Sequence, residues 1–214
     1  METYTIPRAI LKLGGAAGVL AGILMMAGFA LHPAGEDATF GTNPYWVPAH
    51  GLLWIAYTIA LIGWIGVYIV QASRAGKLGV AGFVVIIIGT SLTSWIFSSD
   101  VTFVPVIAAE APKLFQDIFR GGHIAVGIAS VLTWVLGNVL FGSSVIRAKV
   151  FPRWAGILLI IGTVVIPIAY LTRLSMRFVA AGAFIAAAGQ IWLGSALFQI
   201  LRRHATKAND NSLI

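Results

Sequence analysis

Long stretches without a charged residue constrain this chain more than any other feature. One such stretch lies between Lys77 and Asp100, and five others have a similar length and apolar character. Each approaches the roughly 20 apolar residues that a helix needs to cross a bilayer. The chain is 59% hydrophobic and 10% charged, whereas a soluble domain carries about 25% charged residues. We therefore predict an all-α integral membrane bundle.

The apolar stretches predict six transmembrane helices in one membrane domain that covers residues 1–214. The first stretch is too long for the apolar core of a signal peptide, so we count it as a span. The predicted spans are residues 9–31, 51–71, 78–98, 123–145, 154–172 and 178–201, followed by a cytoplasmic tail at 203–214.

The basic residues predict the orientation. With the N-terminus inside, ten of the 14 Lys and Arg residues fall on the inner side, and Lys113, Arg120, Arg173 and Arg177 fall on the outer side. This positive-inside bias places both termini in the cytoplasm of a bacterial inner membrane. The net charge of +7 then indicates contact with anionic lipid rather than with nucleic acid.

An internal repeat is indicated at an offset of 73 residues. His50 aligns with His123, Arg74-Ala75 aligns with Arg147-Ala148, and the segment at 87–90 aligns with the identical segment at 160–163. Histidine and arginine are rare in this chain, so they carry the argument. Spans 51–71 and 78–98 would then be a hairpin duplicated in spans 123–145 and 154–172.

Small residues recur at four-residue spacing on two spans. They are Gly14, Gly18 and Gly22 on the first span, and Gly182 and Ala186 on the last. Such spacing lets helices approach closely. It predicts packing inside the bundle or, alternatively, contact with a second copy of the chain or with other membrane subunits.

Ionisable residues gather at the predicted outer ends of the spans. Three of the four histidines lie there, namely His32, His50 and His123, together with carboxylates such as Asp100. Ionisable groups next to apolar spans are candidates for function by default. The alternative is that these histidines only form hydrogen bonds at the interface and that no cofactor is bound.

Two helical stripes suggest a haem b site. One stripe comprises His50, Trp54, Tyr57, Leu61, Trp64 and Tyr68, and the other comprises His123, Gly127, Ser130, Trp134, Gly137 and Phe141. A flat cofactor could lie against Gly127 and Ser130, held by Trp54 and Tyr57, with His50 and His123 as axial ligands, because imidazole suits iron. Its propionates would pair with outer cations such as Arg173 and Arg177.

A metal ion is the second possibility. His32, His50, His123 and Asp100 offer three imidazoles and a carboxylate, a ligand set that suits zinc or copper. Asp100 also aligns with Arg173 under the repeat offset, so an ion pair between them is a further expectation.

One segment resembles a known group of proteins. It reads His32-Pro33-Ala34-Gly35-Glu36-Asp37 and is followed by Trp46-Val47-Pro48-Ala49-His50. It is similar to small bacterial polytopic membrane proteins that carry an H-P-x-G-E-D element after the first span, a group with no known activity. The resemblance implies the topology and points to His32, Glu36, Asp37 and His50, without naming a reaction.

Three functions therefore remain open. The chain could be a b-type haem protein or a subunit of a redox complex, a non-catalytic accessory subunit of a membrane complex, or a metal-dependent membrane enzyme with its site at the outer face. The sequence contains no cysteine, which excludes thiolate ligands and cysteine nucleophiles. No lysine or carboxylate lies in the middle of a span, which argues against a proton pump.

Overall fold

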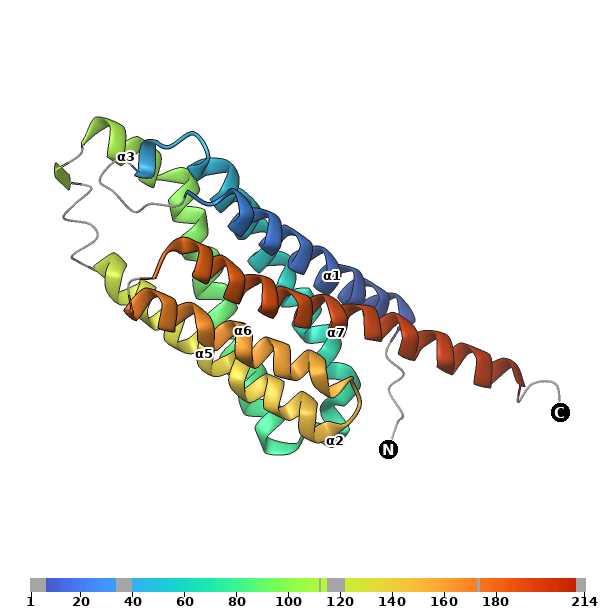
Figure 1. Ribbon diagram of the computed structural model, residues 1–214. Helices are drawn as coiled ribbons and strands as arrows, with labels where there is room; N and C mark the ends of the chain where they lie inside the picture. Colours follow the sequence, from blue (N-terminus) through green and yellow to red (C-terminus); the bar gives the residue numbers. More distant parts are fainter. Residues whose placement is uncertain (1–6, 34–39, 112, 115–121, 173, 211–214) are drawn as a thin grey trace.

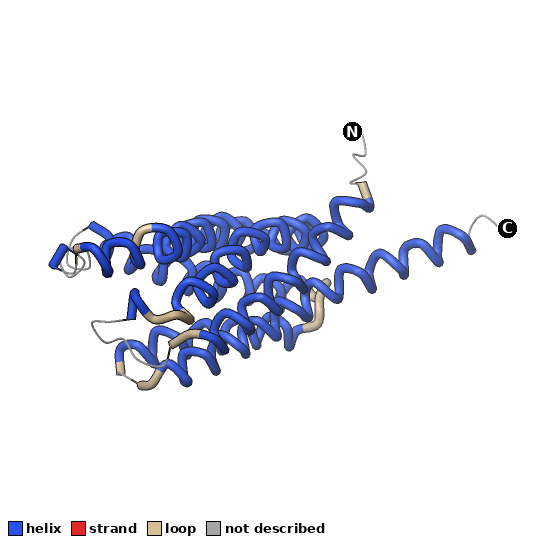
Figure 2. The backbone as a smooth tube through the Cα atoms, turned by 90° about the horizontal axis from the view of Figure 1, so that it is seen from above, coloured by secondary structure: helices blue, strands red, loops and turns tan. Residues whose placement is uncertain are grey.

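The computed structural model describes residues 7–33, 40–111, 113–114, 122–172 and 174–210. Within these residues the chain forms helices and no strand (Figures 1 and 2). The elements are α1 (Arg8–Leu31), the short 3₁₀ helix η1 (Phe40–Thr42), α2 (Trp46–Thr102), α3 (Val104–Glu110), α5 (Gly122–Ala148), α6 (Arg153–Leu171) and α7 (Met176–Asp210). The predicted all-α class is confirmed.

Four helices in the described part of the chain are long and apolar enough to cross a membrane. They comprise Arg8–Leu31, Trp46–Glu110, Ala125–Ala148 and Met176–Arg203, and a shorter apolar helix covers Arg153–Ala169. Every predicted span coincides with an observed helix, apart from residue 172, which follows the end of α6, and two spans, 51–71 and 78–98, fall within α2 alone.

Helix α2 turns back on itself at Gly76. This residue has φ +57° and ψ −161°, a conformation that is open essentially to glycine alone. The two halves of α2 then lie side by side, since the hydroxyls of Thr58 and Ser94 are 2.8 Å apart. One consequence is that the first and last turns of α2 meet at the same end of the bundle.

The helices form a closed ring of neighbours (Figure 1). Helix α1 packs against α2 and α7, α2 packs against α5, and α6 lies between α5 and α7. Two large clusters of buried side chains fill the interior, one that includes Phe141, Leu159 and Leu193, and one that includes Met25 and Trp134, and a small third cluster joins Trp46 to Val104.

The small residues of α1 pack inside this ring. A Cβ at Gly14 would lie 2.9 Å from Cα of Gly66, and a Cβ at Gly63 would lie 2.9 Å from Cα of Gly18. These two backbones can approach so closely only because neither has a side chain at the crossing. The spacing predicted either internal packing or contact with a second copy, and this face of α1 is occupied within the chain.

Large apolar side chains cover the outside of the ring. Leu132, Ile88 and Ile161 are about half exposed or more, and each lies near the middle of a predicted span. An apolar surface of this kind is unusual for a protein in water and is what a bilayer requires of helices that cross it.

Candidate functional site

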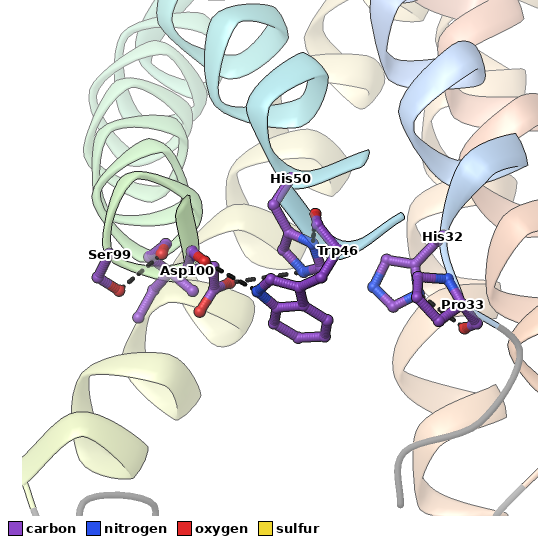
Figure 3. Close-up of polar contacts among 7 residues, drawn as sticks. His32, Pro33, Trp46, His50, Ser99 and Asp100 are labelled. Atoms are coloured by element: carbon purple, nitrogen blue, oxygen red, sulfur yellow. Dashed lines mark hydrogen bonds and ion pairs between the residues drawn. The ribbon is translucent and has the colours of Figure 1, made fainter. Parts of the chain in front are cut away.

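Four side chains meet at the end of the bundle where α3 lies. They are His32, just after α1, Trp46 and His50, in the first turns of α2, and Asp100, near the end of α2 (Figure 3). We call them the His50 cluster. Asp100 lies beside the other three because α2 folds back at Gly76, which brings the last turns of α2 next to its first turns.

Trp46 connects the two ends of α2. Its indole Nε1 donates a hydrogen bond to the backbone oxygen of Asp100 over 2.8 Å. The indole ring also stacks on the imidazole of His50, with 3.7 Å between the ring centroids. Trp46 therefore fixes both the spacing of the two α2 halves and the plane of the His50 ring.

His50 has one ring nitrogen engaged by backbone and the other directed at a carboxylate. Its Nδ1 lies 2.9 Å from the backbone oxygen of Trp46, and because a carbonyl oxygen can only accept, Nδ1 carries the hydrogen. Its Nε2 lies 3.7 Å from Oδ2 of Asp100. This distance is within ion-pair range but longer than a direct hydrogen bond.

The side chains of His50 and Asp100 are almost completely buried. The side chains of His50 and Asp100 are 3% and 10% exposed, and the ring of Phe97 lies 5.6 Å from the imidazole of His50. In such a setting an unpaired carboxylate is costly. Among the described residues, the imidazole of His50 is the group that lies within ion-pair range of the Asp100 carboxylate.

His32 approaches the same place from α1. Its ring centroid lies 4.8 Å from that of His50 and 5.8 Å from that of Trp46. Its Nδ1 is 3.0 Å from the backbone oxygen of Pro33, so this histidine also places Nδ1 against a main-chain carbonyl. That arrangement is typical of histidines that bind metals through Nε2.

The side chains of His32, His50 and Asp100 lie near one another, but they do not all face one common position. Among the described residues, no three His, Asp or Glu side chains stand close enough to hold a metal ion as they are. His50 and Asp100 are in position, and the ring of His32 would have to turn or shift to complete the set.

Other residues of the predicted sites lie in varied places. Tyr57 is buried against Phe97 and Trp134, at 5.3 and 5.8 Å between ring centroids. Trp54 is 38% exposed. The two aromatic side chains that the sequence predicts on either side of a haem thus differ in burial, and the haem site itself stays a prediction.

The residues of α5 predicted to lie against a cofactor are Gly127 and Ser130. The hydroxyl of Ser130 is engaged by Thr93 over 2.8 Å. A Cβ at Gly127 would meet no atom within 4 Å, which leaves space beside that turn of α5. Arg177 is exposed at the start of α7.

Several of the residues singled out in the sequence fall outside the described residues. The backbone of His123 lies at the start of α5, but its side chain is not among those described, and Glu36, Asp37 and Arg173 are not described at all. The predicted contacts of His123 with His50, and of Arg173 with Asp100, therefore stay predictions.

Trp46 was not among the predicted site residues, although it contacts both His50 and Asp100. The available signal was its position four residues before His50, which puts the two side chains on one face of a helix.

The chain matches no protein-family model, no curated protein and no solved structure. The His50 cluster is therefore the feature from which a function can be proposed.

Proposed function

We propose that the protein is a polytopic inner-membrane protein that binds one divalent transition-metal ion, zinc in the first instance, through His50, Asp100 and His32 at the outer end of its bundle. The observation that carries the proposal is the orientation of His50, whose Nδ1 donates to a backbone carbonyl while its Nε2 faces the Asp100 carboxylate at 3.7 Å. In metal sites, a backbone partner on Nδ1 fixes the ring so that Nε2 can bind the ion.

The spacing suits an ion held between the two side chains. Zinc binds imidazole nitrogen at about 2.0–2.1 Å and carboxylate oxygen at about 2.0–2.2 Å. Two such bonds would be long enough to span the 3.7 Å between Nε2 and Oδ2. His32, with its ring 4.8 Å from that of His50, would be the third ligand once its ring has turned toward the other two.

Three protein ligands leave one position on a tetrahedral ion. In zinc enzymes that position holds water, which the metal makes acidic enough to act as a nucleophile near neutral pH. The corresponding activity is hydrolysis at the outer face of the membrane. The burial of His50 and Asp100 favours such a site, because a dry setting strengthens the interaction between ion and ligands.

Haem is the second candidate, and the packing around His50 favours it less. An iron bound to Nε2 would stand about 2 Å from that atom, by analogy with other metal–imidazole bonds, with the macrocycle spread across that direction. The Asp100 carboxylate at 3.7 Å occupies the space that the macrocycle needs. An accessory-subunit role is favoured less as well, since the small-residue face of α1 is used within the chain.

We further propose six spans with both termini in the cytoplasm. The two halves of α2, together with α1, α5, α6 and α7, supply one helical segment for each predicted span. A turn at Gly76 places Arg74 and Lys77 at the end of the bundle away from the His50 cluster, which agrees with the positive-inside rule.

The tandem repeat belongs to the same proposal. Gly89 packs against the backbone of Trp134, and its repeat partner Gly162 packs against the backbone of Ala186. Each glycine thus provides the close contact between its own helical segment and the next long helix in sequence. A second pair of residues at the 73-residue offset, Gln71 and Ser144, is joined by a hydrogen bond of 3.1 Å.

Metal analysis of the detergent-purified protein tests the proposed function. We expect about one equivalent of zinc after incubation with zinc and removal of the excess, and loss of that zinc in His50→Ala and Asp100→Asn. The matched control is His204→Ala. His204 lies near the C-terminal end of α7, so its replacement should leave zinc bound. Zinc that survives both site variants, or no zinc in the unaltered protein, rejects the metal site.

An absorption spectrum of the same sample separates the alternatives. A Soret band in protein produced with ample haem, lost in His50→Ala, would replace the metal proposal by the haem proposal. Protein that binds neither zinc nor haem would leave the accessory-subunit role.

A further inference from the structure

A small cavity lies in the middle of the bundle, away from the His50 cluster. It has a volume of about 10 Å³ and is lined from every large helix, by residues that include Met25 of α1, Trp64 and Thr90 of the two α2 halves, Asn138 of α5, Leu159 of α6 and Gln190 of α7. It lies between the two apolar core clusters, because its lining draws on both.

Three polar side chains that line this cavity carry an atom with no hydrogen-bond partner among the described residues. The atoms are Nε1 of Trp64, Oγ1 of Thr90 and Nε2 of Gln190. The three residues are 3%, 0% and 6% exposed. A buried polar atom without a partner costs free energy, and three of them around one cavity indicate that something polar joins them.

Several other polar side chains of these helices bond to the backbone of their own helix. Asn138 donates from Nδ2 to the backbone oxygen of Trp134 over 2.8 Å. The hydroxyls of Thr58 and Thr93 bond to the carbonyl one turn earlier in their own helix, which is the usual solution for threonine in a helix. Thr90 does not use that solution.

We propose that this cavity is a binding site for one water molecule, which joins Trp64, Thr90 and Gln190 across the bundle. A cavity of about 10–15 Å³, measured as the space open to the centre of a water, is what one molecule needs, with two to four polar partners. The indole and amide N–H groups donate to its two lone pairs, and it donates in turn to the hydroxyl oxygen of Thr90. If the amide of Gln190 is turned over, the water can donate to the amide oxygen instead.

Among possible occupants, the chemistry of the lining favours water over an anion. Two of the three orphan atoms are N–H donors, which alone would also suit a halide ion. No Lys, Arg or His lines the cavity, so an anion there would be desolvated without a counter-charge, which is strongly unfavourable. Water is neutral and supplies both donors and acceptors.

Threonine-to-valine replacement tests the proposal through the sign of the stability change. Thr90→Val keeps the side-chain shape and removes one partner of the water, so we expect the Tm in detergent to fall by about 2–4 °C. The matched control is Thr163→Val. Thr163 is also fully buried and its Oγ1 is also unpartnered among the described residues, but it does not line the cavity, and its replacement should leave the Tm unchanged or raise it.

A second variant tests the bridge itself. Gln190→Met should also lower the Tm, and the Thr90→Val, Gln190→Met double variant should lose less than the sum of the two, because both act through the same water. Thr90→Val that behaves like Thr163→Val, or additive losses in the double variant, overturn the proposal. A Tm that rises with chloride relative to gluconate at equal ionic strength would assign the site to a halide and also overturn it.

Discussion

At the scale of single residues, Trp46 organises the His50 cluster. It donates a hydrogen bond to Asp100 at one edge and stacks on His50 with its face. These two contacts come from different parts of the indole, so they can be separated by substitution. The cluster can therefore be examined without removing any of its ionisable side chains.

Trp46→Phe keeps an aromatic ring against His50 and removes the donor to the backbone oxygen of Asp100. We expect the free energy of unfolding to fall by about 1 kcal/mol, seen as a Tm lower by about 2–4 °C in a thermal melt in detergent. The control is Trp154→Phe, because Trp154 is 53% exposed and the change should have little effect. An equal loss in both variants would show that the Trp46 hydrogen bond contributes no stability of its own.

At the scale of elements, the turn inside α2 determines which residues meet. The two halves of α2 are joined at Gly76 with a positive φ, and their pairing brings Thr58 to Ser94 and Trp46 to Asp100. Every contact of the His50 cluster across α2 depends on this turn. A single glycine thus positions residues that are 54 apart in the sequence.

Gly76→Ala should destabilise the protein by about 1–3 kcal/mol, because a Cβ strains this backbone conformation. The expected result is a lower Tm, measured on purified protein in detergent. Gly51→Ala is the control, since Gly51 lies in the helical first half of α2 and a Cβ there meets no atom within 4 Å. Helix propensity predicts no loss at Gly51, and a loss at Gly51 as large as at Gly76 would contradict the conformational argument.

At the scale of the whole molecule, the bundle has a polar end and a surrounding apolar surface. The first and last turns of α2, which carry most of the His50 cluster, lie at the end occupied by α3, and the turn inside α2 lies at the opposite end (Figure 1). An apolar outer surface in the middle of the helices agrees with a bilayer around them. The proposed topology also assigns the end that carries the His50 cluster to the outer side of the membrane.

Reporter fusions in a bacterial host test that direction. A reporter that is active only in the periplasm should be inactive when fused after Gly76 and active when fused after Glu110, because these residues lie at opposite ends of the bundle and the basic residues favour the Gly76 side as cytoplasmic. A reporter that is active only in the cytoplasm should give the reverse pattern. Periplasmic activity at Gly76 would invert the proposed topology.

The helical class and the helix positions followed from the sequence by itself, because a bilayer-length apolar run is a local property of the chain. The observed α1, α5 and α6 begin and end within a few residues of the predicted spans. His50 and Asp100 were likewise identifiable, since an ionisable residue at the end of an apolar run is conspicuous without knowledge of its neighbours.

Only the tertiary structure decided which side chains face inward. Trp54 and Tyr57 belong to one sequence stripe, yet Trp54 is exposed and Tyr57 is buried. Helical periodicity separates apolar from polar faces, and it cannot separate a lipid-facing side from a packed side when both are apolar. The meeting of His32, Trp46 and Asp100 around His50 also required the fold, because it depends on how α2 turns back and on where α1 ends.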